Sequence, residues 1–586
     1  MITDQVVPQE GVPQPAGHAS RWQLAVIGAV VALAVGIGLV LGFTVLSPRA
    51  AALSTAAGYV PAGAAMYMEA HLDPSENQRA ALRAILERFP AVDPDDILTD
   101  ALADTLDQAE SAFGLPVTYS EDIAPWFDGT VAVSLLDYPL TMDASSMALP
   151  QTAAMFGVKD SDAAATFGDT LRAALTDTGA TFSQAEHAGT TIWSLDVAEM
   201  QSSVPVEGVG FAFAVTGDEV LMANGQGVVQ AMLDAHDGSS SLATKAELGR
   251  LAARLPADWV GLMAVNTQSM FAGMRAQLAD QQPELAELVD SYLENVPDLS
   301  VATFRFADDA LLFDGSSDVP TGPLAPENGQ RSLAAAVPGD AILFADGSRV
   351  GSGLSQAIST MRAAIALQEG GDEITAQIEQ AEAAIGADLE DFVSWIGGGA
   401  LAAGWDGEQP YGGLVLEAAD SAAASTRLGQ LKALIELAQE SGQSITVETV
   451  DIAGVEVTRI VMAGSGDDFM PTPGFEVQYA MNGETVLIGI GDQFVRRSLE
   501  MAAGASLADS ERFGAALGRF GGTDNAGTFF LDLATLRQKV EEELGLAQDP
   551  MYASQIQPNL VPFDYLAMVT RVEGDAAVSR GGLVLR

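Results

Sequence analysis

The sequence predicts an α+β protein in which one N-terminal transmembrane helix precedes two duplicated halves, each a mainly antiparallel sheet packed with amphipathic helices. Three observations predict this class. Residues 24–46 form an uncharged apolar run, segments of the second half repeat those of the first in the same order, and alternating hairpin patterns are mixed with helical ones. Because strands and helices do not alternate regularly, a parallel βαβ sheet is not expected.

Composition limits the class of protein and its partners. A chain of 586 residues is too long for one ordinary core, and 48% apolar with 18% charged residues is typical of folded proteins. The 79 acidic and 27 basic residues give a net charge of −52, which repels phosphate backbones. We therefore expect no nucleic-acid partner. The acidity indicates a well-solvated surface, with salt adaptation or attraction of divalent cations as alternatives.

Side chains that carry chemistry are scarce. There is no cysteine, which excludes disulfides, thiol nucleophiles and cysteine-bound metals, and the four histidines lack the spacing of a metal or catalytic motif. A glycine-rich string from Ile396 weakly resembles a dinucleotide loop, and the acidic residues of 93–104 resemble a calcium site. A strand that contains glycines explains the string better, and capping of a helix start explains the acidic residues better. We predict no catalytic, cofactor-binding or metal-binding residue, and no cofactor.

The N-terminal region predicts a membrane anchor. Residues 1–23 form a short Pro-rich cytoplasmic tail, 24–46 a transmembrane helix and 47–57 a juxtamembrane linker. The 23-residue run would make a helix about 35 Å long, enough to cross a hydrocarbon core of about 30 Å. One arginine lies on each side of the run, Arg21 before it and Arg49 after it. The excess of basic residues that usually marks the cytoplasmic side of a membrane helix is therefore nearly absent. We expect the tail inside the cell and the large C-terminal region outside the cytoplasm.

Small residues recur every four positions within the apolar run, at Ala34, Gly38 and Gly42. This spacing lets two membrane helices approach closely, so it indicates self-association through this stripe as one option. Glycine is also common in membrane helices that do not associate, which leaves the alternative open.

An internal repeat covers the rest of the chain. The segment at Phe211 aligns with that at Phe475, and the segment at Arg305 with that at Arg571, so the offset changes only from 475 − 211 = 264 to 571 − 305 = 266. Repeated segments in one order at a near-constant offset predict duplicated units, each long enough to bury its own core. The two units and the Pro- and Gly-rich linker between them span 58–315, 331–586 and 316–330.

Aligned patterns predict the elements of each unit. Asn482-Gly483 between two apolar runs is the preferred turn of a two-residue hairpin. A helix is expected after the candidate caps Asp160 and Ser161, and a partner helix is expected in the second unit. The residues expected to be buried by these two helices are Phe167, Leu171 and Leu175, and Leu428, Leu431 and Ile435.

A tryptophan recurs at the same point of each unit. Trp126 and Trp395 are 395 − 126 = 269 residues apart, each follows a carboxylate by four residues, and each precedes glycine and an apolar run. Because aromatic side chains dominate core energetics, we interpret both as core residues that enter a buried strand. Glycines after each one, at Gly129 and at 397–399, would let the backbone turn tightly. The alternative is that the two rings line a ligand cleft.

These residues resemble an uncharacterised bacterial family, the domain of unknown function 3352. The resemblance rests on a strand led by proline at 61–67, Leu-Asp-Pro-Ser at 72–75, Arg-Phe-Pro at 88–90 and Asp-Ile-Ala-Pro-Trp at 122–126. The chain departs from the pattern in Phe-Asp-Gly at 127–129, and the second copy lacks the proline before its tryptophan. The resemblance implies a membrane-tethered extracytoplasmic protein, and it carries over no catalytic or binding residue.

Three functional hypotheses remain at this point. The first is a single-span, membrane-anchored extracytoplasmic protein that is not an enzyme and binds or scaffolds a component of the cell envelope. The second is a carrier or chaperone for a hydrophobic ligand such as lipid, held between helices and a curved sheet. The third is an envelope hydrolase with dispersed catalytic residues. A continuous apolar cavity would favour the second hypothesis, and a cleft with convergent carboxylates of perturbed pKa would favour the third.

Overall fold

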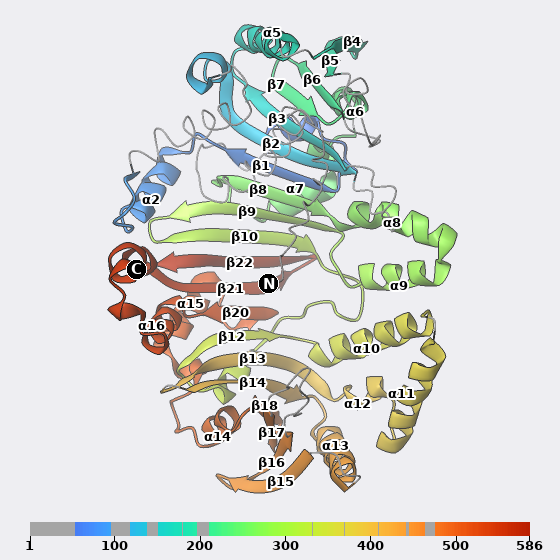
Figure 1. Cartoon of the computed structure of the whole chain (residues 1–586), viewed down its shortest axis with the longest axis vertical. Coiled ribbons are helices and arrows are strands. Elements are labelled where there is room, and N and C mark those ends of the chain that lie inside the picture. Colours follow the sequence, from blue (N-terminus) through green and yellow to red (C-terminus); the bar gives the residue numbers. More distant parts are fainter. Residues whose placement is uncertain are drawn as a thin grey trace, which may run out of the picture.

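The computed structural model describes residues 53–94, 118–137, 150–177, 180–195, 210–238, 240–330, 332–368, 370–407, 409–440, 445–462 and 475–586. Nearly all strands of this part of the chain belong to one twenty-stranded sheet (Figure 1). Every strand pair in that sheet for which a register is defined is antiparallel, as expected from the hairpin patterns. The protein therefore has mixed helix and strand built on a large antiparallel sheet.

The first run of elements leads from the 3-10 turn η1 to strand β10. Its strands are β1 (Met66–His71), β2 (Phe127–Asp137), β3 (Gln151–Val158), β4 (Phe182–His187), β5 (Thr190–Leu195), β6 (Phe211–Val215), β7 (Glu219–Ala223), β8 (Gly261–Asn266), β9 (Leu299–Ala307) and β10 (Ala310–Asp318). Its helical elements are η1 (Thr55–Gly58), α2 (Glu76–Leu86), η2 (Tyr119–Ile123), α5 (Ser161–Asp177), α6 (Gln226–Asp237), η3 (Leu242–Thr244), α7 (Ala246–Ala252), α8 (Thr267–Gln281) and α9 (Pro283–Leu293).

The second run leads from η4 to strand β22. Its strands are β12 (Ala341–Gly347), β13 (Ile396–Asp406), β14 (Gln409–Ala418), β15 (Ile445–Ile452), β16 (Val455–Met462), β17 (Phe475–Asn482), β18 (Thr485–Ile490), β20 (Gly527–Leu531), β21 (Phe563–Glu573) and β22 (Ala576–Leu585). Its helical elements are η4 (Leu333–Ala336), α10 (Val350–Ala366), α11 (Gly371–Ile385), α12 (Leu389–Phe392), α13 (Ser421–Glu440), α14 (Gln493–Leu499), η5 (Leu507–Asp509), α15 (Glu511–Phe520), α16 (Leu533–Glu543), η6 (Leu546–Gln548), η7 (Tyr552–Ile556) and α17 (Gln557–Leu560). A separate small sheet pairs β11 (Gly329–Gln330) with β19 (Asp524–Asn525).

The strand pairings of the first run recur in the second. Strand β1 lies between β2 and β8, and β12 lies in the same way between β13 and β20. Strand β3 joins β2 to β7, and β14 joins β13 to β18. Even an isolated bridge is repeated, between Pro61 and Ser241 and between Pro338 and Ser506. The segments that align in the sequence therefore take part in equivalent pairings.

The two runs meet in the middle of the sheet. Strand β10 pairs with β22 from Ala310 opposite Val584 to Asp318 opposite Ala576, so the ladder continues without a break (Figure 1). Residues 316–318, assigned by the sequence to a linker, lie in β10. The segment that follows is hydrogen-bonded to both runs, since Gly322 N donates to Glu294 O at 2.9 Å and Asn328 Nδ2 to Val572 O at 2.8 Å.

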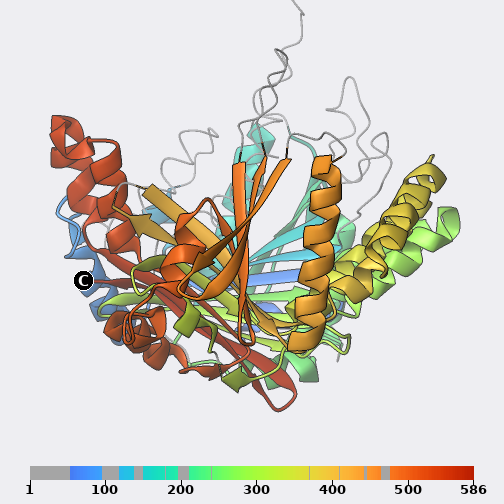
Figure 2. The ribbon, with the colours of Figure 1, turned by 90° about the horizontal axis from the view of Figure 1, so that it is seen from below.

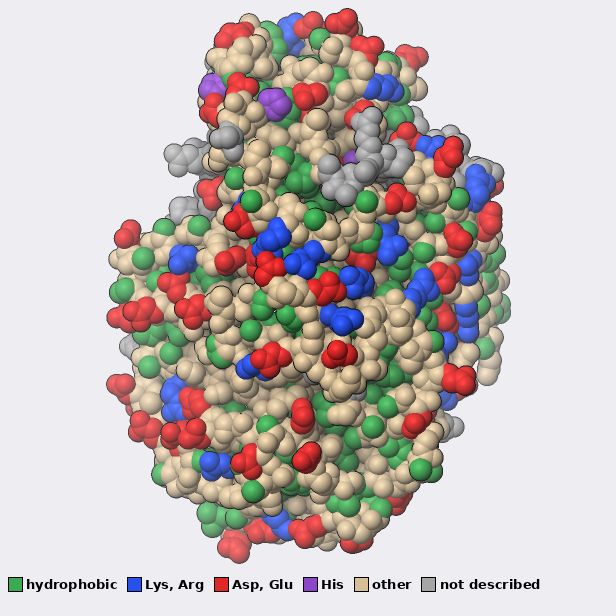
Figure 3. Space-filling view, turned by 180° about the vertical axis from the view of Figure 1, so that it is seen from behind, with side chains coloured by type: hydrophobic (Ala, Val, Ile, Leu, Met, Phe, Trp, Pro, Cys, Tyr) green, Lys and Arg blue, Asp and Glu red, His purple; other side chains and the backbone are tan. Residues whose placement is uncertain are grey.

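The sheet is bent into a trough, with α8–α11 rising along one side and the C-terminal helices along the other (Figure 2). Helices α7 and α15 pack on the outer face, where Leu248, Leu251, Phe513 and Phe520 join the buried sheet residues. Figure 3 shows the outer face, on which basic and acidic side chains are interspersed. Only one face of the central strands is thus covered by these helices.

Most predicted local features are present in the structure. Asn482 pairs with Thr485 across a turn in which Gly483 has a φ of 64°. Asp160 Oδ1 accepts from Ala163 N at 3.0 Å at the start of α5, and Phe167, Leu171 and Leu175 are buried. The prediction for α13 was partly wrong, because Leu428, Leu431 and Ile435 are only half-buried.

Several sequence predictions fall outside the described residues. These are the tail, the transmembrane helix, Ala34, Gly38 and Gly42, and all of the acidic residues of 93–104 except Asp93. Among the helices that are described, none is both long and apolar enough to cross a membrane.

Candidate functional site

Both repeated tryptophans are buried in cores of their own. Trp126 is 2% exposed and packs against Phe167 with ring centroids 4.9 Å apart, and Trp395 is 5% exposed. Their carbonyl groups make equivalent bonds, because Lys159 N donates to Trp126 O at 2.7 Å and Ala419 N to Trp395 O at 2.9 Å. The interpretation as core residues is therefore the one that fits the structure, and neither ring lines an open cleft.

The glycines that follow the two tryptophans have different roles. Strand pairing shifts register at both places, between Phe127 and Val131 and between Ile396 and Gly399. Gly129 has a φ of +93°, which fits the predicted turn. None of the glycines at 397–399 has a positive φ, and a Cβ on Gly399 would lie 3.0 Å from Val350. There the glycines permit close packing.

Two carboxylates, one on β1 and one on β7, are buried on the outer side of the sheet. Glu69 is 3% exposed and Glu219 is fully buried. Tyr67 OH donates to Glu69 Oε2 at 2.6 Å, and His71 Nε2 lies 3.2 Å from Glu69 Oε1. Thr55 Oγ1 donates to Glu219 Oε1 at 2.7 Å. The first described residues of the chain therefore cover both carboxylates.

Burial changes the acidity of these two groups. It raises the pKa of Glu69 to about 6, although hydrogen bonds from Tyr67 and Ser54 oppose the shift. It raises the pKa of Glu219 to about 8, with the negative charges of Asp128 and Asp218 adding to the effect. Carboxylates with shifted pKa values are common in active sites. These two, however, are closed off from solvent and accept hydrogen bonds from neighbouring side chains. Their arrangement suits a structural role.

The second run repeats only part of this acidic pair. Asp346 occupies the position of Glu69, because Glu69 pairs with Leu262 and Asp346 with Thr528, and 528 − 262 = 266. Hairpin pairs Val215–Val220 and Met481–Val486 are equivalent, which places Thr485 at the position of Glu219. The residue opposite is Gly157 in the first run and Glu417 in the second. The carboxylate is therefore on one strand of the pair in the first run and on the opposite strand in the second. Glu219 is buried, whereas Glu417 is exposed.

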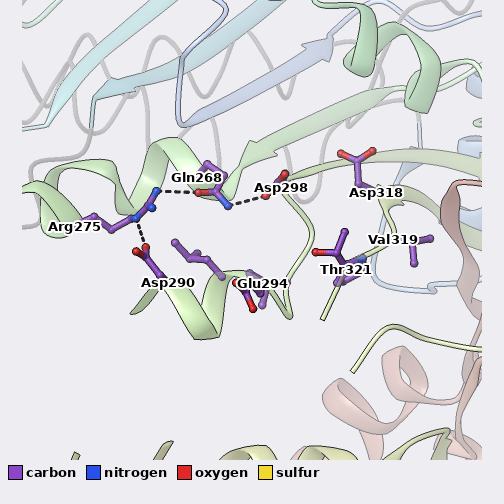
Figure 4. A pocket seen from close by; sticks show the side chains of 11 residues that line it. Gln268, Arg275, Asp290, Glu294, Asp298, Asp318, Val319 and Thr321 are labelled. Atoms are coloured by element: carbon purple, nitrogen blue, oxygen red, sulfur yellow. Dashed lines mark hydrogen bonds and ion pairs between the residues drawn. The ribbon is translucent and has the colours of Figure 1, made fainter. Parts of the chain in front are cut away.

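A polar pocket of about 360 Å³ lies between α8, α9 and the segment after β10 (Figure 4). Its central side chains form a chain of contacts, because Arg275 Nε donates to Asp290 Oδ1 at 2.6 Å and Arg275 NH1 to Gln268 Oε1 at 3.2 Å. Gln268 Nε2 in turn donates to Asp298 Oδ1 at 2.7 Å. These groups satisfy one another, so the pocket presents no converging reactive set.

The inner face of the sheet carries the feature that stands out. Two adjacent rows of apolar side chains cross the sheet from β9 to β14 and β18 along register partners. A glycine interrupts each row once, Gly581 between Phe313 and Met568 and Gly412 between Ala403 and Ile490. We call these rows the apolar band. Its members are Phe304, Phe306, Leu311, Phe313, Leu343, Ala345, Leu401, Ala403, Leu414, Ile490, Phe529, Leu531, Leu566, Met568 and Leu583.

The band is accessible, although the residues that alternate with it are not. Leu401 is 45% exposed, Leu414 41% and Met568 42%, whereas Phe344 and Phe530 on the other face are buried in the core. The remaining members are at least partly exposed. The residues that the structure describes leave this contiguous apolar surface uncovered, which is rare in soluble proteins, and large exposed apolar surfaces often mark binding sites. The sequence analysis did not identify the band.

Metal binding finds no support in this part of the structure. Within the described ranges no group of three or more His, Cys, Asp or Glu side chains is arranged to hold an ion. We predicted no site residues because the sequence contains no site motif, and an apolar surface such as the band carries no motif of that kind. Its only sequence signal is a run such as Gly-Thr-Phe-Phe-Leu at 527–531, apolar on both faces.

Within the described residues, the protein has mixed helix and strand, and its large antiparallel sheet carries an exposed band of apolar side chains on one face. A family model described as "Protein of unknown function (DUF3352)" matches residues 25–586, so the chain belongs to that family. The match confirms the resemblance found in the sequence. No curated protein and no solved structure was found to match the chain.

Proposed function

We propose that this chain is a single-span, membrane-anchored binding protein whose large C-terminal region lies outside the cytoplasm. The anchor is the uncharged run at 24–46, which is long enough to cross a bilayer. The binding surface is the apolar band, and the band is the observation that carries the proposal. In this proposal the protein is not an enzyme.

Architecture supports a single extended surface. We infer that the two runs are duplicated units, because the same strand order and the same isolated bridge occur in each. Joining them through β10 and β22 extends one sheet across the whole molecule. The band lies on the sheet of both units, so duplication would have enlarged the surface available to a ligand.

The structure gives a reason to prefer binding over hydrolysis. The carboxylates of raised pKa, Glu69 and Glu219, are buried under the chain that precedes β1 and have no room for a substrate. The apolar band is the accessible surface, and its side chains include no nucleophile. A carrier of hydrophobic ligands is the specific form of binding that such a surface favours.

Protease protection tests the anchor and its orientation. Protease added to intact spheroplasts that express the full chain should digest the region beyond about Arg49 and spare the N-terminal tail, because only the tail lies inside. Permeabilised spheroplasts are the control, in which both parts should be cut. Protection of the large region in intact spheroplasts would overturn the proposed orientation.

Binding of an apolar fluorescent dye tests the surface. Leu401→Asn removes an apolar side chain that is 45% exposed in the band, and Leu437→Asn removes one that is 60% exposed on α13. The full chain should bind the dye, and the Leu401 variant should bind it more weakly while the Leu437 variant should not differ. Equal binding by all three proteins would remove the band from the proposed function.

A further inference from the structure

We propose that the apolar band holds the acyl chains of membrane lipids. This inference rests on the proposed function and names the chemical class of its ligand. The band crosses eight neighbouring strands from β9 to β14, a distance of ~34 Å at ~4.8 Å per strand. Half of a hydrocarbon core is about 15 Å, so the band has room for an acyl chain laid along it.

The backbone of the sheet excludes an extended peptide as the occupant. Each of these eight strands has a hydrogen-bonded neighbour on both sides, so its N–H and C=O groups are directed within the sheet. A peptide laid across the band would lose water from its own backbone groups and gain no partners. An acyl chain has no such groups to satisfy.

The shape of the face argues against a second copy of the chain. The inner face is concave and has helices rising beside it (Figure 2). Two concave faces of this kind would meet at their rims before their centres touched. A flexible ligand that enters the trough does not meet this obstacle.

Beside the band runs a row of small residues. Gly315, Thr570, Ser579, Gly527 and Gly347 are linked to one another by strand pairing. A Cβ added at Gly347 would meet no atom within 4 Å. The band is therefore bordered by residues with short side chains or none, and the two hydroxyl groups among them, Thr570 Oγ1 and Ser579 Oγ, bond to each other at 2.8 Å.

The chain itself indicates the source of the acyl chains. The apolar run ends at Leu46, and the described structure begins at Leu53, which packs on the first core. The six residues between them reach at most about 20 Å when fully extended. In the proposed topology the first described residues are thus held close to a bilayer, where lipid is the abundant apolar ligand.

Photolabelling tests the inference. The full chain is reconstituted into phosphatidylcholine vesicles that contain a little phosphatidylcholine with a photoactivatable acyl chain, then irradiated and mapped by mass spectrometry. We expect adducts in 24–46 and also in peptides of the band. Leu401→Asn combined with Leu414→Asn should lower the band adducts about tenfold and leave those of 24–46 unchanged. Leu437→Asn is the matched control and should change neither.

The outcomes separate this inference from the proposed function. Adducts confined to 24–46 would leave the anchor standing and overturn lipid binding by the band. Adducts in neither region would overturn the anchor. Equal band labelling in the double variant would also overturn the inference, provided that its melting temperature matches that of the unaltered chain. Native mass spectrometry that finds a bound peptide in place of lipid would assign the band to another ligand and refute ours.

Discussion

Asp314 and Arg580 face each other across the ladder that joins β10 to β22, and each occupies the same position in its own run. The equivalence follows from the hairpin turns, since Ala310 pairs with Ala307 and Ala576 with Glu573, and 576 − 310 and 580 − 314 both equal 266. An antiparallel pair of equivalent residues lies on an approximate two-fold axis. The junction of the two runs is therefore the symmetry centre of the sheet.

Replacing Asp314 should weaken this centre. Asp314 is buried, and its Oδ2 accepts from Arg305 Nε at 2.9 Å. Asp314→Asn leaves the Arg305 charge without its partner, which in a buried pair costs about 3 kcal/mol. Because Arg305 is partly exposed, we expect ~2 kcal/mol, measured by denaturant unfolding. Asp309→Asn, which alters an exposed pair with Arg519, is the control and should cost under ~1 kcal/mol.

The continuous ladder also predicts how the described region unfolds. The sequence suggests units that bury separate cores, and such units could melt one after the other. The β10–β22 ladder instead couples the two runs. If either run unfolded, the strand of the other run at this junction would lose its partner. We expect one calorimetric transition whose calorimetric and van't Hoff enthalpies agree. Two resolved transitions would show that the junction is weaker than its register suggests.

Stability should fall as the pH rises from about 4.5 to about 8. The pKa of Glu219 is raised from 4.5 to about 8, so the folded state retains a proton that the unfolded chain releases in this interval. Glu69, with a pKa of about 6, adds to the slope in the lower part of the interval. Glu219→Gln should flatten the decline between pH 6 and pH 8 in thermal melts.

Glu417→Gln provides the matched control for this experiment. Glu417 lies on the strand opposite the position equivalent to Glu219, but it is exposed. Its replacement should leave the pH dependence of the melting temperature unchanged. A steep decline that persists in the Glu219 variant would mean that another group controls the alkaline limb.

Local features were predictable where a short segment determines them. Asn482-Gly483 specifies its own turn, and Asp160 caps the helix that it precedes, so both were found from sequence. Pairings between distant strands have no such local signal. Nothing in β10 indicates that it pairs with β22. The band was missed for a related reason, because a strand such as β20 is apolar on both sides and its sequence does not tell which face the helices cover.

The acidic cluster was also beyond sequence reasoning. Glu69 and Glu219 are single acids in apolar strands, which usually means exposure at an edge. Only the fold places the two side chains together under Thr55 and beside Tyr67. Burial then shifts their pKa values, an effect that depends on the packed structure and not on residue type.

The chain's acidity predicts that salt stabilises the fold. A net charge of −52 implies repulsion within the compact state, and salt screens it over a Debye length of ~10 Å at 0.1 M. The melting temperature should rise with NaCl at pH 7. The same series near the isoelectric pH of about 4.1 is the control and should show a much weaker rise. A flat response at pH 7 would indicate that ion pairs already compensate the charge.

The two tryptophans should respond differently to one conservative change. Trp126 Nε1 donates to Asp122 O at 2.8 Å, whereas Trp395 Nε1 is buried without a hydrogen-bond partner among the described residues. Trp126→Phe loses a hydrogen bond as well as ring volume, so it should cost about 1 kcal/mol more than Trp395→Phe. Either change to alanine should cost about 3–5 kcal/mol, as large-to-small core changes do. Denaturant unfolding of the four variants measures these differences. If the two phenylalanine variants were equally stable, the Trp126 bond would contribute nothing. If an alanine variant kept full stability, that ring would not support its core.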